Sequence, residues 1–373
     1  MRAPKKPQPK EILVLANHSG GLYDFRGALL AAMRAYGCVT AAVPHNDKWE
    51  ELASVTDGCI DVPVDRRGVN PVRDWFLLRR YRALIRERKP ALVVTYTVKP
   101  NIWGGIACRR ARVPYAVNVT GLGTAFERSG LLRRIVVHLY KKALRGARVV
   151  FFENSHDRDV LCATGAVPAG RDVVLPGAGV DLVRHPALPY PEDGPVHFLF
   201  VGRVMREKGV DEFLAAAKRL KAARGDAVTF EIVGSMEEGY RETLDAYARD
   251  GIVTYTGILP DVTPAYRRAH AVVLPSYHEG MSNVLLEGAA SARPLITSDI
   301  PGCREAVVTD EDNESGLLCP VHDADALCTA MEALCDRPRD ERAAMGLRGR
   351  AHMEAHFDKA DVVRTTLTAL GLV

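Results

Sequence analysis

The chain has 373 residues, of which 47% are hydrophobic and 26% are charged, and its formal net charge is +4. A chain of this length more often forms two domains than one, and this apolar content supports two hydrophobic cores. No apolar run approaches the roughly 18 residues of a membrane-spanning helix, and the eight cysteines contain no C-x-x-C pair. We therefore expect a protein of a reducing cytoplasm, with neither a zinc site nor a disulfide framework.

Charge is unevenly distributed along the chain. Residues 1–189 contain 30 Lys and Arg against 16 Asp and Glu, whereas residues 190–373 contain 20 against 30. Halves of opposite sign favour different partners, and the basic half suits nucleic acid, an anionic membrane surface or a phosphorylated substrate. No recognition motif or interleaved basic and aromatic surface for nucleic acid is present, so no nucleic-acid partner is expected. The basic, proline-rich residues 1–10 are expected to be a disordered leader.

Strands and helices alternate through the first half of the chain. Apolar runs predict strands at 11–16, 39–43, 91–95, 115–119, 149–152 and 173–175, and helical spacing predicts helices at 25–36, 72–89 and 131–145. A loop is expected at 17–23, where Gly20 and Gly21 follow the first strand. The pattern lacks a full G-x-G-x-x-G, so the two glycines fit either a close approach to a ligand or a tight turn.

Two further loops lie at the carboxyl ends of predicted strands. Residues 96–104 follow the third strand and residues 120–123 follow the fourth. Ligands of open α/β sheets bind outside these strand ends, so both loops lie where a site is expected. Within the first of them, Lys99 is either an anion contact or a solvated lysine.

The helix predicted at 131–145 is basic and amphipathic. Its apolar positions are Leu131, Leu132, Ile135, Val136, Leu139, Tyr140 and Ala143. Lysines and arginines occupy much of the remaining surface, which is typical of a helix that contacts a membrane surface. The apolar stripe can pack on the sheet while the basic face meets anionic lipid. We expect association with an anionic membrane surface.

The second half repeats the alternation after a linker. Proline and acidic residues mark 186–195 as the linker, and strands are predicted at 196–201, 229–233, 253–255, 271–274, 294–297 and 316–318. Alternating strands and helices predict parallel sheets, and hence two Rossmann-like, doubly wound α/β domains facing each other across a cleft. We expect domains at 1–185 and 190–355, followed by a C-terminal segment, 356–373, whose helix packs back on the first domain.

The second domain contains a cationic strand end. Arg203 and Lys208 follow its first strand, and each is adjacent to a glycine. Two cations with two glycines are suited to a diphosphate. Alone this is a moderate signal, because Lys-Gly before a helix is common.

Residues 278–287, H-E-G-M-S-N-V-L-L-E, join a buried strand to a helix that opens near Ser282. Free backbone N–H groups and the helix dipole make such a junction an anion site. Glu279 and Glu287 bracket it. A bound phosphate would repel either carboxylate, so each is better suited to accept hydrogen bonds from the hydroxyls of a sugar or a ribose. An anion site flanked by two such carboxylates suits a nucleotide sugar. The alternative is an ordinary capped helix with solvated glutamates.

These motifs resemble family 4 retaining glycosyltransferases of the GT-B fold. The resemblance rests on Gly202-Arg203 with Lys208-Gly209, on Glu279-x7-Glu287 and on residues 298–305, S-D-I-P-G-C-R-E. In the first half, residues 97–104 and 119–123 resemble the branch that builds bacterial capsule, O-antigen and lipid-linked oligosaccharides on undecaprenyl diphosphate.

The resemblance implies roles for the matching residues. The catalytic group is Arg203 and Lys208, which would hold the donor diphosphate, and Glu279, which would contact the sugar hydroxyls. Donor binding is expected of Gly20, Gly21, Gly280, Met281, Ser282, Asn283 and Glu287, the last at the ribose, and acceptor binding of Arg26, Lys99, Asn118 and Thr120. A histidine that many members carry near residue 119 is absent here, which leaves His18 and His278 as the nearest candidates.

The predicted reaction is transfer of a sugar, favouring N-acetylhexosamine, from a UDP-sugar to an undecaprenyl-diphosphate-linked saccharide. The enzyme would lie on the inner face of the plasma membrane. No metal or other cofactor is expected, because Arg203, Lys208 and the helix N-terminus at Ser282 would stabilise the leaving UDP. The alternatives are a soluble acceptor, a UDP-sugar 2-epimerase and a protein that only binds nucleotide sugars. The incomplete glycine fingerprint disfavours an NAD-dependent oxidoreductase.

Overall fold

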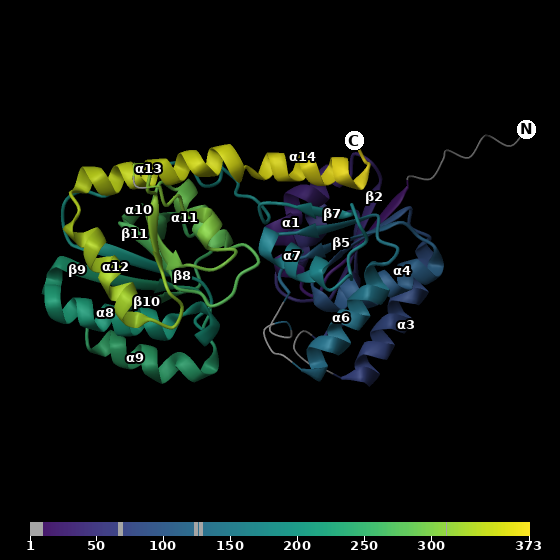
Figure 1. The fold of residues 1–373 in the computed structure, drawn as a ribbon, viewed down its shortest axis with the longest axis horizontal. Helices are drawn as coiled ribbons and strands as arrows, with labels where there is room; N and C mark the ends of the chain where they lie inside the picture. Colours follow the sequence, from purple (N-terminus) through teal and green to yellow (C-terminus); the bar gives the residue numbers. More distant parts are fainter. Residues whose placement is uncertain (1–9, 66–69, 123–125, 127–129, 311) are drawn as a thin grey trace, which may run out of the picture. The chain divides into compact units, whose positions relative to one another are not determined.

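The computed structural model describes residues 10–65, 70–122, 126, 130–310 and 312–373. They form two units (Figure 1). The N-terminal unit contains the described residues up to Ala178 together with 362–373, and the C-terminal unit contains 179–361. All strand pairs in both sheets are parallel, which confirms the predicted class of two doubly wound α/β domains. No helix in the described ranges is long and apolar enough to cross a membrane.

The N-terminal unit has a seven-stranded sheet in the order β3-β2-β1-β4-β5-β6-β7. Its strands are β1 Glu11–Leu15, β2 Cys38–Val43, β3 Gly58–Asp61, β4 Leu92–Tyr96, β5 Tyr115–Val119, β6 Val149–Phe152 and β7 Asp172–Val174. Its helices are α1 Ser19–Met33, α2 Trp49–Val55, α3 Pro71–Arg88, the π-helix η1 Pro100–Gly104, α4 Gly105–Ala111, α6 Leu131–Leu144, α7 Ser155–Ala163 and α14 Lys359–Leu370. The strand order reverses between β1 and β4, the place where open α/β sheets form a ligand crevice.

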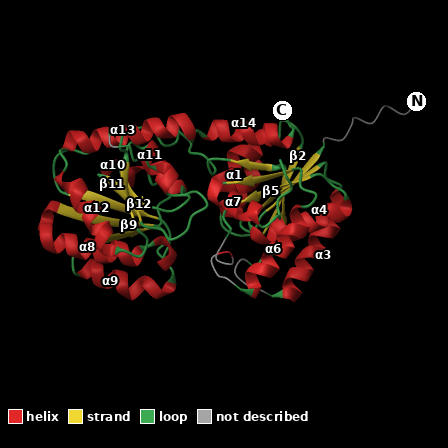
Figure 2. Ribbon diagram, viewed as in Figure 1, coloured by secondary structure: helices red, strands yellow, loops and turns green. Residues whose placement is uncertain are grey.

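Helices cover both faces of this sheet (Figure 2). Alternate residues of β1 point to opposite faces, as the period of a strand requires. Ile12 and Val14 pack with the apolar residues of α1, α2 and α14. Leu13 and Leu15 pack with those of α3, α4 and α6. The helix at the C-terminal end of the chain therefore completes the core of the N-terminal unit.

The loop expected at 17–23 is wrong, because α1 begins at Ser19. His18 occupies the N-cap, and its Nδ1 accepts a hydrogen bond from the Gly21 N–H at 3.0 Å. Gly20 and Gly21 therefore lie in the first helical turn. Ser, Thr, Asp and Asn are the usual N-cap residues, so a histidine cap gives no start signal in the sequence.

The C-terminal unit has a six-stranded sheet in the order β10-β9-β8-β11-β12-β13. Its strands are β8 Val196–Val201, β9 Val228–Val233, β10 Thr254–Gly257, β11 Ala271–Leu274, β12 Leu295–Ser298 and β13 Gly316–Cys319. Its helices are α8 Val210–Arg224, α9 Arg241–Arg249, α10 Thr263–Arg268, α11 Asn283–Ala290, α12 Ala324–Asp336 and α13 Arg339–His356, with short 3-10 turns η2 Arg206–Lys208, η3 Gly225–Ala227, η4 Glu238–Tyr240 and η5 Arg304–Ala306. Here the strand order reverses between β8 and β11.

A side-chain cap begins α12 in this unit. Asp323 is the N-cap of this helix. Its side chain accepts hydrogen bonds from the backbone N–H groups of Asp325 and Ala326. A short acceptor at the N-cap satisfies amides that have no partner inside the helix.

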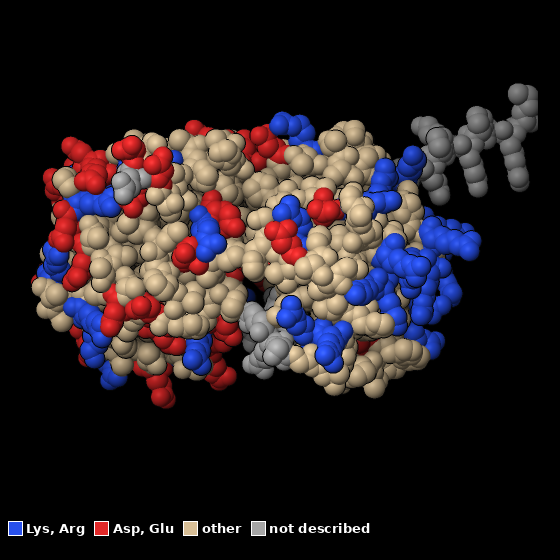
Figure 3. Space-filling model, viewed as in Figure 1, with Lys and Arg blue, Asp and Glu red and all other residues tan. Residues whose placement is uncertain are grey.

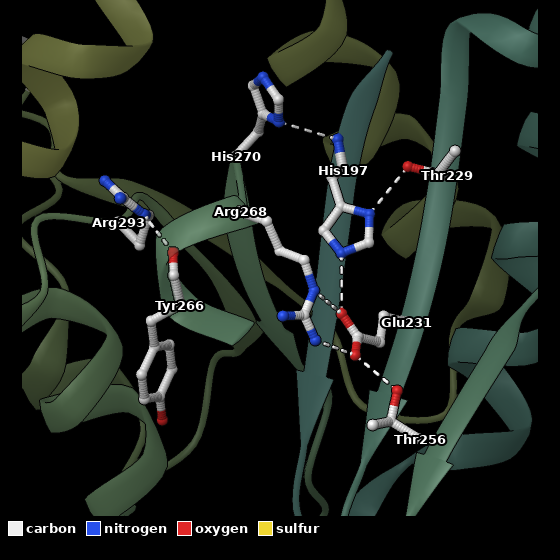
Figure 4. Close-up of polar contacts among 8 residues, drawn as sticks. All are labelled: His197, Thr229, Glu231, Thr256, Tyr266, Arg268, His270 and Arg293. Carbon is white, nitrogen blue, oxygen red and sulfur yellow. Dashed lines mark hydrogen bonds and ion pairs between the residues drawn. The ribbon is translucent and has the colours of Figure 1, made fainter. Parts of the chain in front are cut away.

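Glu231 is the centre of a buried polar cluster on the sheet of this unit (Figure 4). Its carboxylate accepts two hydrogen bonds from the Arg268 guanidinium and one from Thr256 Oγ1, and His197 Nε2 lies 3.1 Å away. Burial alone would raise the pKa of this carboxyl. The hydrogen bonds from His197, Arg268 and Thr256 outweigh burial and hold the pKa well below its usual range. The cluster therefore joins three neighbouring elements, β8, β9 and β10, to the end of α10.

Residues 186–195, predicted to be a linker, contain no helix or strand and pack on the C-terminal unit. The fully buried guanidinium of Arg293 holds them: Nη1 donates to Leu188 O at 3.3 Å and Nη2 to Pro189 O at 2.7 Å. Nε donates to Tyr266 O at 2.7 Å (Figure 4). Burial lowers the pKa of Arg293 to about 10, so the group remains charged at neutral pH. Carbonyl dipoles, rather than a carboxylate, compensate this charge.

Replacing Arg293 by Leu is expected to lower the free energy of unfolding by about 3 kcal/mol, because several buried carbonyls lose their donors together. Thermal and urea unfolding measure this loss. Limited proteolysis is also expected to cleave faster within 186–190. Arg249→Leu, on the surface of α9, is the matched control and is expected to change stability by less than about 0.5 kcal/mol. Equal stabilities of the two variants would contradict this role.

Candidate functional site

The predicted cationic strand end and the predicted anion site come from neighbouring strands. Arg203 and Lys208 follow β8, and Glu279 follows β11. Two other strands separate them in sequence, but β8 and β11 pair directly, with Phe198 opposite Ala271. The strand order reverses between these two strands. The candidate site therefore lies at the switch point of the C-terminal sheet, where parallel sheets bind ligands.

Lys208 and Glu279 form an ion pair at this point. Lys208 Nζ donates to Glu279 Oε1, and Ser276 Oγ donates to the same oxygen at 2.8 Å. The Lys208 side chain is 25% exposed and that of Glu279 is 11% exposed. Two of the residues expected to bind the donor thus compensate each other's charge. A diphosphate that reaches Lys208 would replace or share this carboxylate.

Backbone contacts fix the two loops against each other. Lys208 ends the 3-10 turn η2, and Gly209 caps it in the left-handed region at φ 71°. A Cβ at Gly209 would lie 2.0 Å from Pro275 O, so only glycine allows this approach. In addition, the Tyr277 N–H donates to Glu207 O at 2.9 Å. The sequence motif Lys-Gly is thus a packing requirement as well as a source of charge.

The predicted helix start at Ser282 is confirmed, but the helix is not capped by the serine side chain. α11 begins at Asn283 with Ser282 at the N-cap, but the Ser282 side chain makes no capping hydrogen bond. The Ser282 N–H donates to Gly302 O at 2.8 Å. Met281 and Ser282 are buried, and Gly280 and Asn283 are half-buried. The first turn of α11 therefore presents backbone N–H groups that no side chain of its N-cap satisfies, which favours an anion.

Gly302 explains why the motif at 298–305 accompanies this loop. It has φ 83°, and a Cβ there would lie 2.6 Å from Glu279 O and 2.7 Å from Gly280 O. Its own N–H donates to Glu305 Oε2 at 2.7 Å. The segment around Gly302 therefore lies directly against the loop that carries Glu279 and fixes its backbone.

Glu287, expected at the ribose, lies one turn further along α11 and is 29% exposed. Tyr266 Oη donates to its Oε2 at 3.2 Å, and His185 Nε2 lies 4.0 Å from its Oε1. Burial lowers the pKa of His185 to about 4, so this histidine is neutral at pH 7. Sequence reasoning missed Tyr266 and His185, because a buried tyrosine and a loop histidine give no pattern that links them to Glu287.

Arg203 differs from Lys208 in being exposed, and no acidic residue of the described chain forms an ion pair with it. It follows Gly202, which ends β8 with its N–H bonded to Val233 O at 2.9 Å. The described residues include no group of three His, Cys, Asp or Glu side chains arranged to hold a metal ion. Arg203, Lys208 and the N-terminus of α11 each contribute positive charge near this strand end.

The first turn of α1 follows β1 in the N-terminal unit. A Cβ at Gly20 would lie 2.5 Å from Asp47 Oδ2, so the helix packs tightly on the loop that carries Asp47. His18 Nε2 lies 3.1 Å from Asp47 Oδ1. The structure thus gives Gly20 and Gly21 a local packing and capping role.

Two of the expected acceptor residues are buried and bonded to the chain itself. The Arg26 guanidinium is 6% exposed, forms an ion pair with Glu153 and donates to Gly177 O at 3.4 Å. Asn118 is 3% exposed, and its Nδ2 donates to Thr95 O at 3.4 Å. Thr120 is half-buried directly after β5. Arg26 and Asn118 therefore hold strand ends together at the edge where ligands of parallel sheets bind.

The segment after β4 has unusual backbone and unusual polar groups. Thr97 has φ 71°, which costs a residue with a branched Cβ about 1 to 3 kcal/mol. Its Oγ1 and the Oη of Tyr96 are buried without a hydrogen-bond partner. Lys99 Nζ forms an ion pair with Asp74 Oδ1 at 2.9 Å, and η1, a π-helix, follows it. Strain, unsatisfied polar atoms and π-helices are concentrated at functional sites. The strain and the π-helix have no sequence signature, and Lys99 is the one residue of this segment that the sequence predicts as a site residue.

Comparison with known families identifies the chain. Residues 11–154 match the family described as glycosyl transferase 4-like, and residues 195–337 match the family described as glycosyl transferases group 1. The two matches account for most of both sheets. The chain belongs to the group 1, family 4 glycosyltransferases. The resemblance of its motifs to family 4 glycosyltransferases is thereby confirmed.

Several known proteins are similar to this glycosyltransferase, and they match different parts of its length. A Campylobacter jejuni protein named N,N'-diacetylbacillosaminyl-diphospho-undecaprenol alpha-1,3-N-acetylgalactosaminyltransferase is 24% identical over 361 residues, which is 91% of this chain and 92% of the relative. Glycogen synthase of Mycobacterium tuberculosis is 31% identical over 207 residues, 53% of this chain and 48% of the relative. The structure of Anabaena HepE in complex with UDP matches with a TM-score of 0.79 at 18% identity, covering 97% of this chain and all of that one. The structural match establishes the GT-B fold.

Replacing Gly302 by Ala is expected to lower the affinity for the nucleotide sugar and kcat/KM by at least about tenfold, because the new Cβ displaces the backbone of the Glu279 loop. Calorimetric titration with UDP and steady-state kinetics measure both. Gly251→Ala is the matched control: Gly251 also has a left-handed φ, 67°, but open space surrounds its Cβ position. If the two variants lose the same activity, backbone strain alone explains the effect. The close contact of Gly302 with the Glu279 loop would then not be what fixes that loop.

Proposed function

We propose that this glycosyltransferase moves a sugar, an N-acetylhexosamine, from a UDP-sugar to an undecaprenyl-diphosphate-linked saccharide. The reaction takes place at the inner face of the plasma membrane and retains the anomeric configuration. The observation that carries the donor half of the proposal is the ion pair of Lys208 with Glu279 beside the N-terminus of α11. It brings a cation, a carboxylate and helix N–H groups to the switch point of one sheet.

The energetic problem in this reaction is the charge of the leaving UDP. As the bond between the anomeric carbon and the phosphate oxygen breaks, negative charge grows on the diphosphate. Lys208, Arg203 and the N-terminus of α11 stabilise that charge without any rearrangement of water. The same positive charges also contribute to donor binding. They increase the rate only to the extent that they stabilise the transition state more than the bound donor.

Bond formation takes place on the face from which UDP leaves. The acceptor hydroxyl oxygen bonds to the anomeric carbon, and its proton passes to the departing phosphate oxygen, so atoms and charge balance without an enzyme nucleophile. Glu279 contacts sugar hydroxyls rather than the anomeric carbon, and Glu287 contacts the ribose. This division fits the different partners of the two carboxylates, Lys208 for the first and Tyr266 for the second.

The lipid-linked acceptor is supported by a relative that matches nearly the whole chain. The C. jejuni protein carries both the acceptor and the transferred N-acetylgalactosamine in its name, and the alignment spans 91% of this chain. A soluble acceptor is the second candidate. It is favoured by the higher identity, 31%, to glycogen synthase, although that relative is matched over only 48% of its length.

Replacing Lys208 or Arg203 by Ala is expected to lower kcat by on the order of 100-fold or more, because each removes a charge that stabilises the leaving diphosphate. Single-turnover kinetics with a saturating donor measure the chemical step. Lys218→Ala, an exposed lysine on α8, serves as control and is expected to retain normal activity. Near-normal turnover in both of the first two variants would contradict the assignment.

A donor screen tests the reaction itself. Purified protein is incubated with UDP- and GDP-sugars and a mixture of undecaprenyl-diphosphate-saccharides in detergent, and nucleotide release is measured. We expect release of UDP from a UDP-N-acetylhexosamine only when the lipid acceptor is present. Release with a water-soluble glycan instead supports the second candidate. Binding of UDP with no release in any mixture would contradict an enzymatic role.

A further inference from the structure

Large apolar side chains are exposed together at the start of two helices in the N-terminal unit. Thirteen such side chains are exposed among the described residues. Six belong to the first two turns of α3 and α6: Val72, Trp75, Phe76, Leu131, Leu132 and Ile135, and we call them the α3–α6 patch. Their exposed fractions lie between 39% and 74%. Scattered apolar residues are ordinary on a surface, but this concentration is not.

The apolar stripe predicted for α6 is divided between core and surface. Tyr140, Ala143 and Leu144 are buried, whereas Leu131 and Ile135 at the other end are exposed. Packing of the stripe inside the unit, one of the two possibilities that the sequence leaves open, therefore applies to the second half of the helix only. The first half has no partner among the described residues of its own unit that would bury it.

On α3 the exposed residues share one face of the helix. Val72, Trp75, Phe76 and Arg79 follow the spacing i, i+3, i+4 and i+7, and the Arg79 guanidinium lies 4.7 Å from the Trp75 ring centroid. The opposite face, with Leu77 and Tyr81, is buried. α3 and α6 begin at the same end of the unit, and both contact η1 (Figures 1 and 2).

Basic residues surround this apolar end. α3 and α6 together contain ten basic and two acidic residues, and α6 has no acidic residue at all. In Figure 3 Lys and Arg gather over the N-terminal unit, and the end of that unit where the two helices begin is largely uncharged on the face shown. An apolar surface with an aromatic residue and a basic border is the pattern of an interfacial membrane contact.

The patch is directly connected to the candidate acceptor site. Asp74 lies between Arg73 and Trp75 on α3, and its carboxylate forms the ion pair with Lys99 after β4. The strained Thr97 belongs to the same segment as Lys99. An acceptor that is anchored in a bilayer would therefore be delivered beside the element that contacts the bilayer.

We propose that the α3–α6 patch docks on an anionic bilayer, with its six side chains in the headgroup region and the surrounding Lys and Arg on lipid phosphates. This rests on the membrane-bound acceptor proposed above and names the surface that meets the membrane. It differs from attraction through the basic face alone, because apolar burial contributes to binding that salt does not screen. Docking itself needs neither donor nor catalysis.

The test is sedimentation of the full chain with vesicles, without any nucleotide sugar. We expect binding to phosphatidylglycerol-containing vesicles that weakens but persists in 1 M salt. Trp75→Ser with Phe76→Ser is expected to reduce the bound fraction roughly tenfold. Leu347→Ser, an equally exposed apolar residue on α13 of the C-terminal unit, is the matched control and should bind as the unchanged protein does. Circular dichroism and thermal unfolding establish that the variants are folded.

Three outcomes would overturn the proposal. One is no binding of the unchanged protein to anionic vesicles. Another is equal binding by the Trp75/Phe76 variant. The third is a dimer of the unchanged protein that the patch variant converts to a monomer, since the patch would then cover a second copy of the chain. UDP release from donor in detergent is measured in parallel, so a failure of the docking surface is distinguished from a failure of the proposed reaction.

Discussion

A parallel sheet ends all its strands at one edge, and both units of this protein depend on that constraint. Where the strand order reverses, the connections from two adjacent strands leave in opposite directions and open a crevice. In the C-terminal unit the adjacent strands are β8 and β11, and they bring Lys208 and Glu279 together. In the N-terminal unit they are β1 and β4, and the loops that follow them carry His18 and the segment from Thr97 to Lys99. The strand order of each sheet thus brings the loops that carry the candidate residues together, independently of their side-chain contacts.

Charge compensation recurs at these edges. Lys208 pairs with Glu279, Lys99 with Asp74 and Arg26 with Glu153, and each pair is at least half-buried. Removing a charge from water is costly, and an opposite charge within ion-pair distance offsets part of that cost. If Lys208 binds the donor diphosphate, as proposed, the cost of recruiting it would be the partial loss of one ion pair, rather than the ordering of a free lysine.

The sequence predicts most of this architecture, because its strands are continuous apolar runs and its key helix starts are polar. The strand at 271–274 and the helix after Ser282 follow from those patterns. The histidine cap of α1 was missed because histidine is not a typical N-cap residue. The pairing of β8 with β11 was missed for a different reason: strand order is a property of the sheet and has no local signal.

Side-chain surroundings were the least predictable part of the site. Helical spacing identifies the apolar stripe of α6, but only packing decides that Tyr140 is buried and Leu131 is exposed. Likewise, the φ of Thr97 and the contact of Gly302 with Glu279 O arise from tertiary structure. These are the features that shape the candidate donor and acceptor sites, and motifs alone identify only some of their residues.

The central claim is that Lys208 binds the donor diphosphate and that Glu279, its ion-pair partner, competes with the diphosphate for Lys208. Calorimetric titration of UDP into Lys208→Ala and Glu279→Gln tests this most directly. The account predicts that UDP binds about tenfold more weakly to the first variant, and more tightly to the second, because Gln removes a carboxylate that competes for Lys208. Uridine, which lacks the phosphates, is predicted to bind both alike. Equal UDP affinities in all three proteins, or weaker UDP binding to Glu279→Gln, would contradict the account.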